Sequence, residues 1–192
     1  MLTIKNLYKS FGEKVIFKDF SATFENGIYI VNGESGIGKT TLLRMIASLD
    51  TDYTGEIIGG GFDNVSFSFQ EYRLFEHLNA LENVLLVLNG QSEGNNEIAS
   101  HILDSLGITE KDRLLFPCQM SGGMKLRVSI ARALCKEAPI LLLDEPSREL
   151  NIEYVRSLVE ILQARAAKQI IIIVTHDQSL AQLCTGAKII TL

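Results

Sequence analysis

The chain has 192 residues, of which 46% are hydrophobic, and a formal net charge of −5, values that suit one globular domain with a sizeable core. The negative charge argues against a nucleic-acid partner, because proteins that bind nucleic acids present a basic face to the phosphates. The longest apolar runs, such as 170–174, are far shorter than the roughly 20 residues of a membrane-spanning helix.

The N-terminal segment predicts short antiparallel strands. Apolar and polar residues alternate through 1–11, and a second short strand is expected at 15–17. Asn26-Gly27 is typical of a hairpin turn. The N-terminus has no apolar core of the signal-peptide kind, so we expect the protein to stay in the cytoplasm.

A glycine-rich loop follows, between an apolar strand-like run at 28–31 and a helix-like run at 42–46. Its sequence, GESGIGKTT at 33–41, matches the pattern GxxxxGK[ST]. Glycines let successive amide N–H groups point into one concavity, where the dipole of the following helix adds to their attraction for phosphate. We expect Lys39 to reach the β and γ phosphates and the Thr40 hydroxyl to coordinate Mg²⁺. The predicted phosphate-binding residues are Gly33, Glu34, Ser35, Gly36, Ile37, Gly38, Lys39, Thr40 and Thr41.

The middle of the chain changes from a strand pattern to a helical one. The triple glycine 59–61 indicates another hairpin, before a strand that ends at Gln70. Apolar residues then recur at helical spacing through 78–106, and the polar stretch 91–96 is expected to separate two helices. A third helix is expected to begin at Ser121.

From residue 140 onward, strand and helix alternate, as in a parallel α/β sheet. The three cysteines, Cys118, Cys135 and Cys184, have neither CxxC spacing nor a companion pair of histidines. We therefore expect no disulfide framework and no zinc site.

Two further segments carry candidate chemistry. The apolar run 140–143 ends in Asp144 and Glu145, at the strand end where open α/β sheets place their ligands. Asp144 could hold Mg²⁺ and Glu145 could accept a proton from water, although a solvated strand end is the alternative. Ser121-Gly122-Gly123, at the start of a helix, is either a second anion site or an ordinary serine cap. A second phosphate site is useful only if it closes over a nucleotide held by another copy.

The order and spacing of these motifs resemble the nucleotide-binding subunit of ABC transporters, over essentially the whole chain. In this resemblance 33–41 is the Walker A loop, Gln70 is the Q-loop glutamine and 120–124 is the signature. Asp144-Glu145-Pro146 matches Walker B, and His176, after an apolar strand, resembles the switch histidine.

The resemblance implies an α/β fold with a P-loop NTPase (RecA-like) core at 1–70 and 131–192. An antiparallel β subdomain would lie at the N-terminus, and a helical subdomain with the signature would occupy 71–130. Phe11 takes the place of the aromatic residue that stacks on adenine, with Tyr8 as the alternative.

The family mechanism implies ATP and Mg²⁺ as cofactors. Lys39, Glu145 and His176 would be catalytic, and Thr40, Gln70 and Asp144 would serve the metal. Ser121, Gly122 and Gly123 would contact the ATP of a second subunit. The function implied is ATP hydrolysis by a dimer that encloses two ATP molecules and powers a membrane transporter. Its partners would be a second copy or a paralogous ATPase, and separate permease subunits at the inner face of the membrane.

Three positions depart from the family pattern. Met120 and Met124 replace the signature leucine and glutamine. Met124, together with the sequence of 69–84, resembles the corresponding residues of importers of nitrate, sulfonates and taurine. Asn151 stands in place of the D-loop aspartate. An ATP-binding switch with weak or no hydrolysis, in a heterodimeric exporter, is therefore the alternative. A soluble P-loop kinase fits neither Ser121-Gly122-Gly123 nor the His176 strand.

Overall fold

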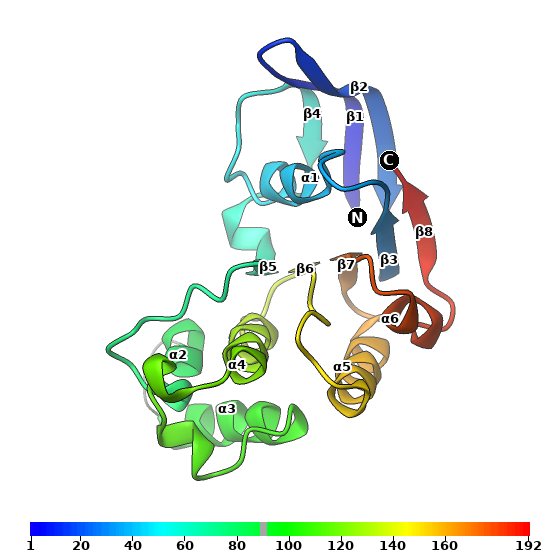
Figure 1. The fold of residues 1–192 in the computed structure, drawn as a ribbon. Helices are drawn as coiled ribbons and strands as arrows, with labels where there is room; N and C mark the ends of the chain where they lie inside the picture. Colours follow the sequence, from blue (N-terminus) through cyan, green and yellow to red (C-terminus); the bar gives the residue numbers. More distant parts are fainter. Residues whose placement is uncertain (89–91) are drawn as a thin grey trace.

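The computed structural model describes residues 1–88 and 92–192, arranged as two sheets with helices around them (Figure 1). The first sheet has the order β2-β1-β4 and is antiparallel. Its strands are β1 (Leu2–Phe11), β2 (Lys14–Phe24) and β4 (Thr54–Ile58). This sheet confirms the predicted antiparallel entry, with strands that are longer than expected.

The second sheet has the order β5-β6-β7-β3-β8, and all its strand pairs are parallel. Its strands are β3 (Gly27–Asn32), β5 (Val65–Ser68), β6 (Ile140–Asp144), β7 (Ile170–Val174) and β8 (Lys188–Thr191). Every residue of β6 and β7 is buried. Their continuous apolar runs are typical of strands that are covered on both faces.

Both hairpins predicted from turn residues are wrong. Asn26-Gly27 connects β2 to β3, and β3 pairs with β7 and β8 in the other sheet. The glycines at 59–61 likewise lead from β4 in the first sheet to β5 in the second. Turn residues indicate a change of direction, whereas the choice of sheet follows from the apolar runs that need burial on two faces.

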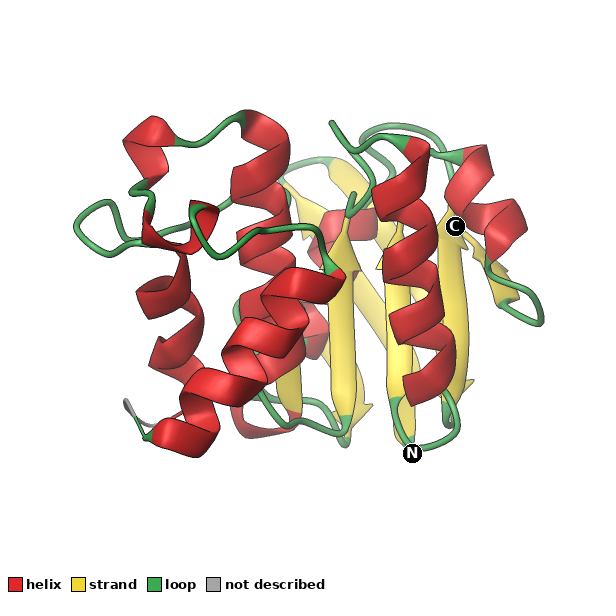
Figure 2. Cartoon of the chain, turned by 90° about the horizontal axis from the view of Figure 1, so that it is seen from below, coloured by secondary structure: helices red, strands yellow, loops and turns green. Residues whose placement is uncertain are grey.

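The six α-helices of the described residues are α1 (Lys39–Ile46), α2 (Ala80–Leu85), α3 (Glu93–Ser105), α4 (Gly122–Cys135), α5 (Ile152–Arg165) and α6 (Gln178–Leu183). Figure 2, which shows the molecule from below, has helices both in front of the strands and to one side of them. The helices from α2 through α6 pack on one face of the parallel sheet in one apolar cluster. In a second cluster, α1 and the antiparallel sheet pack on the other face. None of the helices in the described part of the chain combines the length and apolarity that a bilayer span requires.

The polar stretch 91–96 was expected to lie between two helices, but its second part belongs to a helix. Gln91 lies outside the described residues, but α3 already begins at Glu93. Ser92 caps this helix, since its hydroxyl accepts a hydrogen bond from the Asn95 N–H at 3.2 Å. A good cap followed by an acidic first turn starts a helix even where the sequence is polar.

One buried amide fixes the segment between β5 and α2. The side chain of Asn83 is fully buried, accepts a hydrogen bond from the Phe75 N–H at 2.8 Å and donates to the carbonyls of Phe75, Leu78 and Asn79. Replacing it would leave several buried backbone groups without partners.

We therefore expect Asn83→Ala to lower the free energy of unfolding by about 3 kcal/mol, measured by urea denaturation. The exposed Glu97, on α3, is the matched control, and Glu97→Ala should change stability by less than about 0.5 kcal/mol. Equal stability of the two variants would show that the Asn83 hydrogen bonds do not hold this segment.

Candidate nucleotide site

A cavity of about 620 Å³ lies at the carboxyl ends of β6 and β7, beside the N-terminus of α1. This is the edge at which open α/β sheets bind ligands, and the volume is in the range of small-molecule sites. The residues that line it are Phe11, Lys14, Ile16, Ser35, Gly36, Gly38, Lys39, Thr40, Thr41, Gln70, Asp144, Glu145, Arg148, Val174 and His176. The structure thus brings residues of the phosphate loop together with Phe11, Gln70, Asp144, Glu145 and His176, whereas 121–123 are not among the lining residues.

The loop between β3 and α1 curls around the Lys39 ammonium group. Lys39 is 6% exposed, and its Nζ donates hydrogen bonds to the carbonyls of Gly33 at 2.8 Å and Glu34 at 2.9 Å. Gly38 has a φ of +118°, and a Cβ there would lie 2.3 Å from Ile16 Cγ2, so both the backbone and the packing require glycine. The result is a buried cation within a concave loop at a helix N-terminus, an arrangement suited to phosphate.

A threonine and a buried carboxylate meet beside this loop. Thr40 Oγ1 donates a hydrogen bond to Asp144 Oδ2 at 2.8 Å, while Asp144 Oδ1 has no partner among the described residues. Burial raises the pKa of Asp144 above its ordinary value, and the Thr40 hydrogen bond opposes that rise.

An unpaired carboxylate oxygen in a buried place is costly, and a divalent cation would relieve that cost. Hydroxyl and carboxylate oxygens are ligands that Mg²⁺ prefers, so Thr40 and Asp144 fit this metal. Gln70 lines the same cavity and can contribute its side-chain oxygen.

Glu145 and His176 face each other at the ends of β6 and β7. The Glu145 N–H donates to the Val174 carbonyl at 2.8 Å, and Glu145 has a φ of +52°, which turns the chain sharply after β6. Its carboxylate accepts a hydrogen bond from the His176 N–H at 3.3 Å and lies 3.6 Å from His176 Nε2. A carboxylate held in this way beside the cavity can accept a proton from a bound water.

Of the two aromatic candidates, Phe11 lines the cavity and Tyr8 does not. Phe11 is 53% exposed, and the Lys9 ammonium lies over its ring, 4.7 Å from the centroid. This position favours Phe11 as the residue that stacks on adenine, which stays a prediction.

Three residues of the predicted loop do not line the cavity. Gly33 and Glu34 present their carbonyls to Lys39, and the Glu34 and Ile37 side chains border a neighbouring hollow beside Lys14. Their contact with ATP stays a prediction.

The segment Ser121-Gly122-Gly123 lies away from this cavity. The Ser121 hydroxyl caps α4, accepting a hydrogen bond from the Met124 N–H at 3.2 Å. Glu149 packs against both glycines: a Cβ on Gly122 would lie 2.0 Å from Glu149 Oε2, and one on Gly123 would lie 2.9 Å from the Glu149 carbonyl. These residues do not reach a nucleotide in the cavity of their own chain, and their action on the ATP of a second subunit stays a prediction.

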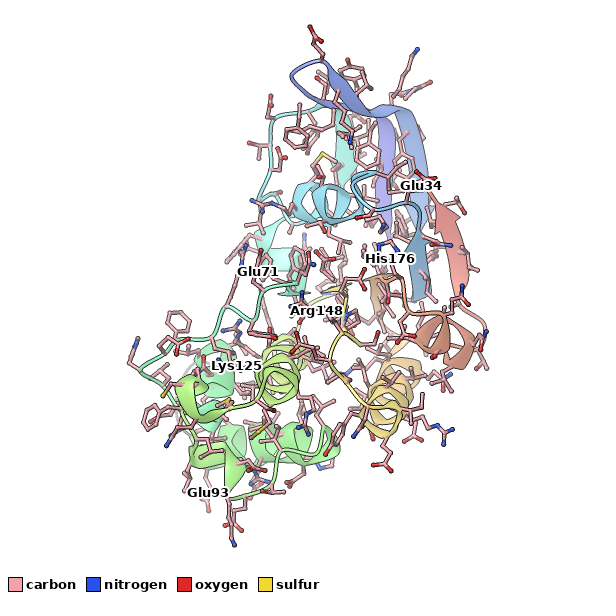
Figure 3. The ribbon with its side chains drawn as sticks, in the orientation of Figure 1. Glu34, Glu71, Glu93, Lys125, Arg148 and His176 are labelled. Carbon is pink, nitrogen blue, oxygen red and sulfur yellow. The ribbon has the colours of Figure 1, made fainter. Side chains whose placement is uncertain are left out.

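Sequence reasoning missed two cations of the cavity, Lys14 and Arg148. Lys14 pairs with Phe11 across the β1–β2 hairpin, so the aromatic assignment could have indicated it. Figure 3 shows Arg148 near His176, whereas Lys125 lies on α4. Arg148 belongs to the turn after Glu145, where no spacing rule predicts which way a side chain points.

A family model described as ABC transporter matches residues 17–148. The chain belongs to the ABC transporter family. The chain is 35% identical to the spermidine/putrescine import ATP-binding protein PotA of Pasteurella multocida, over 93% of this chain and 52% of that protein. It is 36% identical to the L-cystine import ATP-binding protein TcyC of Bacillus subtilis, over 95% of this chain and 83% of that protein. The chain thus spans about half the length of PotA.

Solved structures of ABC cassettes share the fold. The dimeric structure of MJ0796, a bacterial ABC transporter cassette, matches with a TM-score of 0.89 and 27% identity, over all of this chain and 94% of that one. A post-hydrolysis state of MJ0796 bound to ADP and Pi matches equally well, with 29% identity. These matches confirm the predicted family and its P-loop NTPase α/β fold. The branch that imports nitrate, sulfonates and taurine stays a prediction.

Proposed function

We propose that this ABC family member is an ATP-binding and ATP-hydrolysing subunit that dimerises around two ATP molecules and powers a membrane transporter. One observation carries the proposal. A phosphate loop around Lys39, the Thr40–Asp144 pair with its unpartnered carboxylate oxygen, and the Glu145 carboxylate converge on a single cavity. These are the parts that hydrolysis of a magnesium nucleotide requires.

The residues would divide the chemistry among them. The loop amides and Lys39 bind the phosphates, and Thr40, Gln70 and Asp144 hold Mg²⁺, which when bound neutralises part of the phosphate charge. Glu145 accepts the proton of the attacking water, and His176, beside it, contacts the γ-phosphate. Phe11 stacks on the adenine.

The partner of the dimer would complete the site. Ser121, Gly122 and Gly123 do not line the cavity of their own chain, and their helix N-terminus, against which Glu149 packs, would face the ATP of another subunit. MJ0796, a cassette of the same fold, is described as dimeric. The second subunit is either another copy or a paralogous ATPase.

An apolar groove of about 200 Å³ supports the proposed contact with a permease. It lies where α1, β5 and α4 meet, and its margins include Phe62, which is 71% exposed, and Leu49, which is 41% exposed. Exposed apolar surface of this kind marks protein interaction sites. Membrane contact would be made only through this partner, with the chain in the cytoplasm at the inner face of the membrane.

Import is the favoured direction, since PotA and TcyC are both described as import ATP-binding proteins. The alternative, a weakly active switch in a heterodimeric exporter, rested on Asn151 and on the altered signature residues Met120 and Met124. In the structure Asn151 caps α5 and accepts a hydrogen bond from the Tyr154 N–H at 3.2 Å, a task that aspartate would perform equally well. The substitution therefore keeps the helix cap, and the weakly active switch stays the alternative.

Magnesium dependence of phosphate release tests this function. The purified chain should release phosphate from ATP, and removal of Mg²⁺ with EDTA should stop the release. Thr40→Ala removes one metal ligand, and we expect it to raise the Mg²⁺ concentration for half-maximal release about tenfold.

The exposed Thr23, on β2, is the matched control, and Thr23→Ala should behave as the wild type. Transfer of phosphate to a metabolite instead of water would restore the kinase alternative. An unchanged Mg²⁺ requirement in Thr40→Ala would remove Thr40 from the metal site.

A further inference from the structure

Arg148 is a cation of the nucleotide cavity that the proposed mechanism does not use. Of the three basic side chains that line the cavity, two belong to the phosphate-loop side. Lys39 Nζ is held by loop carbonyls, and Lys14 Nζ donates to the Gly36 carbonyl at 3.2 Å. Arg148 lies on the other side, where its Nη2 donates to the Gln70 carbonyl at 3.3 Å.

The backbone holds Arg148 close to Glu145. The Arg148 N–H donates to the Glu145 carbonyl at 3.2 Å, which closes a tight turn directly after β6. Because Glu145 itself has a positive φ, this turn brings its side chain and that of Arg148 to the same cavity. Arg148 and His176 both line the cavity, and Figure 3 labels both residues.

The guanidinium has two long contacts, to the Gln70 carbonyl and to Glu149, and it also interacts with the Tyr72 hydroxyl. The bond to the Gln70 carbonyl is longer than the usual 2.7–3.2 Å, and Arg148 Nε lies 3.6 Å from Glu149 Oε1. The other oxygen of Glu149 accepts a stronger hydrogen bond, from the Tyr72 hydroxyl at 2.8 Å. The Arg148 side chain is also 44% exposed, so it can turn without disturbing the core.

The charges around Arg148 indicate what it would bind. Asp144 and Glu145 bring two carboxylates to this part of the cavity, and a nucleoside triphosphate adds further negative charge. A guanidinium group has a planar set of donors that matches two phosphate oxygens, and it stays charged at any physiological pH. Arg148 therefore has the charge and the position to receive the terminal phosphate on the side of Glu145.

We propose that Arg148 is a phosphate-binding residue that contacts the terminal phosphate of the nucleoside triphosphate bound in its own chain, and that it leaves the Gln70 carbonyl to do so. The inference rests on the proposed function, because it takes the triphosphate as the ligand. A diphosphate lacks the group that Arg148 contacts. Arg148 thus favours the triphosphate, and binding of that ligand loosens the connection between the turn at 145–148 and the segment after β5.

Equilibrium binding of two nucleotides tests this role. Two probes are used, ADP and a non-hydrolysable imido analogue of ATP. Each is titrated into the full chain in the presence of Mg²⁺. We expect Arg148→Gln to weaken binding of the analogue about tenfold, the loss of one charge-assisted contact, and binding of ADP less than about twofold. Arg148→Lys keeps the charge and should recover part of the affinity for the analogue.

Two further variants separate a phosphate contact from a structural role. Arg156, exposed on α5, is the charge-matched control, and Arg156→Gln should bind both nucleotides as the wild type does. Glu149→Gln removes the ion pair but leaves the guanidinium, so it should bind the analogue at least as tightly as the wild type.

Equal weakening of analogue and ADP in Arg148→Gln, or no weakening, would overturn the inference. A loss of analogue binding in Glu149→Gln as large as that in Arg148→Gln would also overturn it. The Arg148–Glu149 ion pair, and not a phosphate contact, would then account for the effect of Arg148→Gln. If the wild type bound neither nucleotide, the proposed function itself would fail and this inference with it.

Discussion

Glu145→Gln should reduce steady-state phosphate release by about 10²- to 10⁴-fold and leave ATP binding intact. The Glu145 carboxylate lies beside the cavity, near His176, and can accept the proton of an attacking water. Glutamine keeps the shape and the hydrogen bond from the His176 N–H, but it cannot take up a proton at neutral pH. Phosphate release and nucleotide affinity, measured on the same preparation, separate the two effects.

The matched control for this experiment is Glu153→Gln, on the exposed surface of α5. It removes the same charge from a place outside the cavity, and phosphate release should stay within about twofold of the wild type. If Glu145→Gln retained full turnover, another group would be the base and the assignment of Glu145 would be wrong.

Lys39→Ala should act one step earlier, on nucleotide binding. The buried ammonium is the cation at the centre of the loop, where it donates to the Gly33 and Glu34 carbonyls, and its loss would remove the proposed charge-assisted contacts to two phosphates. We expect affinity for ATP to fall about a hundredfold, close to 3 kcal/mol of binding free energy, and turnover to fall with it. Titration with a fluorescent ATP analogue measures this change.

Lys18, exposed on β2 and not among the residues that line the cavity, provides the comparison, since Lys18→Ala removes an equal charge. Circular dichroism should show that Lys39→Ala is folded before its affinity is interpreted. Wild-type affinity in a folded Lys39→Ala protein would contradict the account of the loop.

The features predicted well from the sequence are those with local causes. The loop pattern places Lys39 and Thr40 at the start of a helix, and a buried strand that ends in Asp144-Glu145 must open onto the carboxyl edge of a parallel sheet. Ser121 was expected at the start of a helix, and it caps α4. In these cases the residues of the motif and its immediate neighbours determine the local structure.

Features that depend on distant parts of the chain were not predictable in the same way. The glycine turns at 26–27 and 59–61 are locally compatible with hairpins, but the sheet joined by β3 and β5 is decided by partners more than 70 residues away, such as β6 and β7. Arg148 lines the cavity because Glu145 adopts a positive φ, and a glutamate at this position does not predict such a backbone conformation. The division into a core at 1–70 and 131–192 and a helical subdomain at 71–130 stays a prediction.

We infer that the nucleotide cavity of one chain is completed by the Ser121–Gly123 segment of a second copy of the same chain. Light scattering of the Glu145→Gln protein tests it most directly, because bound ATP then persists. With Mg²⁺ and ATP we predict a mass twice the 21.3 kDa of one chain, and with ADP the mass of a single chain. A mass of one chain in saturating ATP, or a dimer that forms equally in ADP, would contradict the claim.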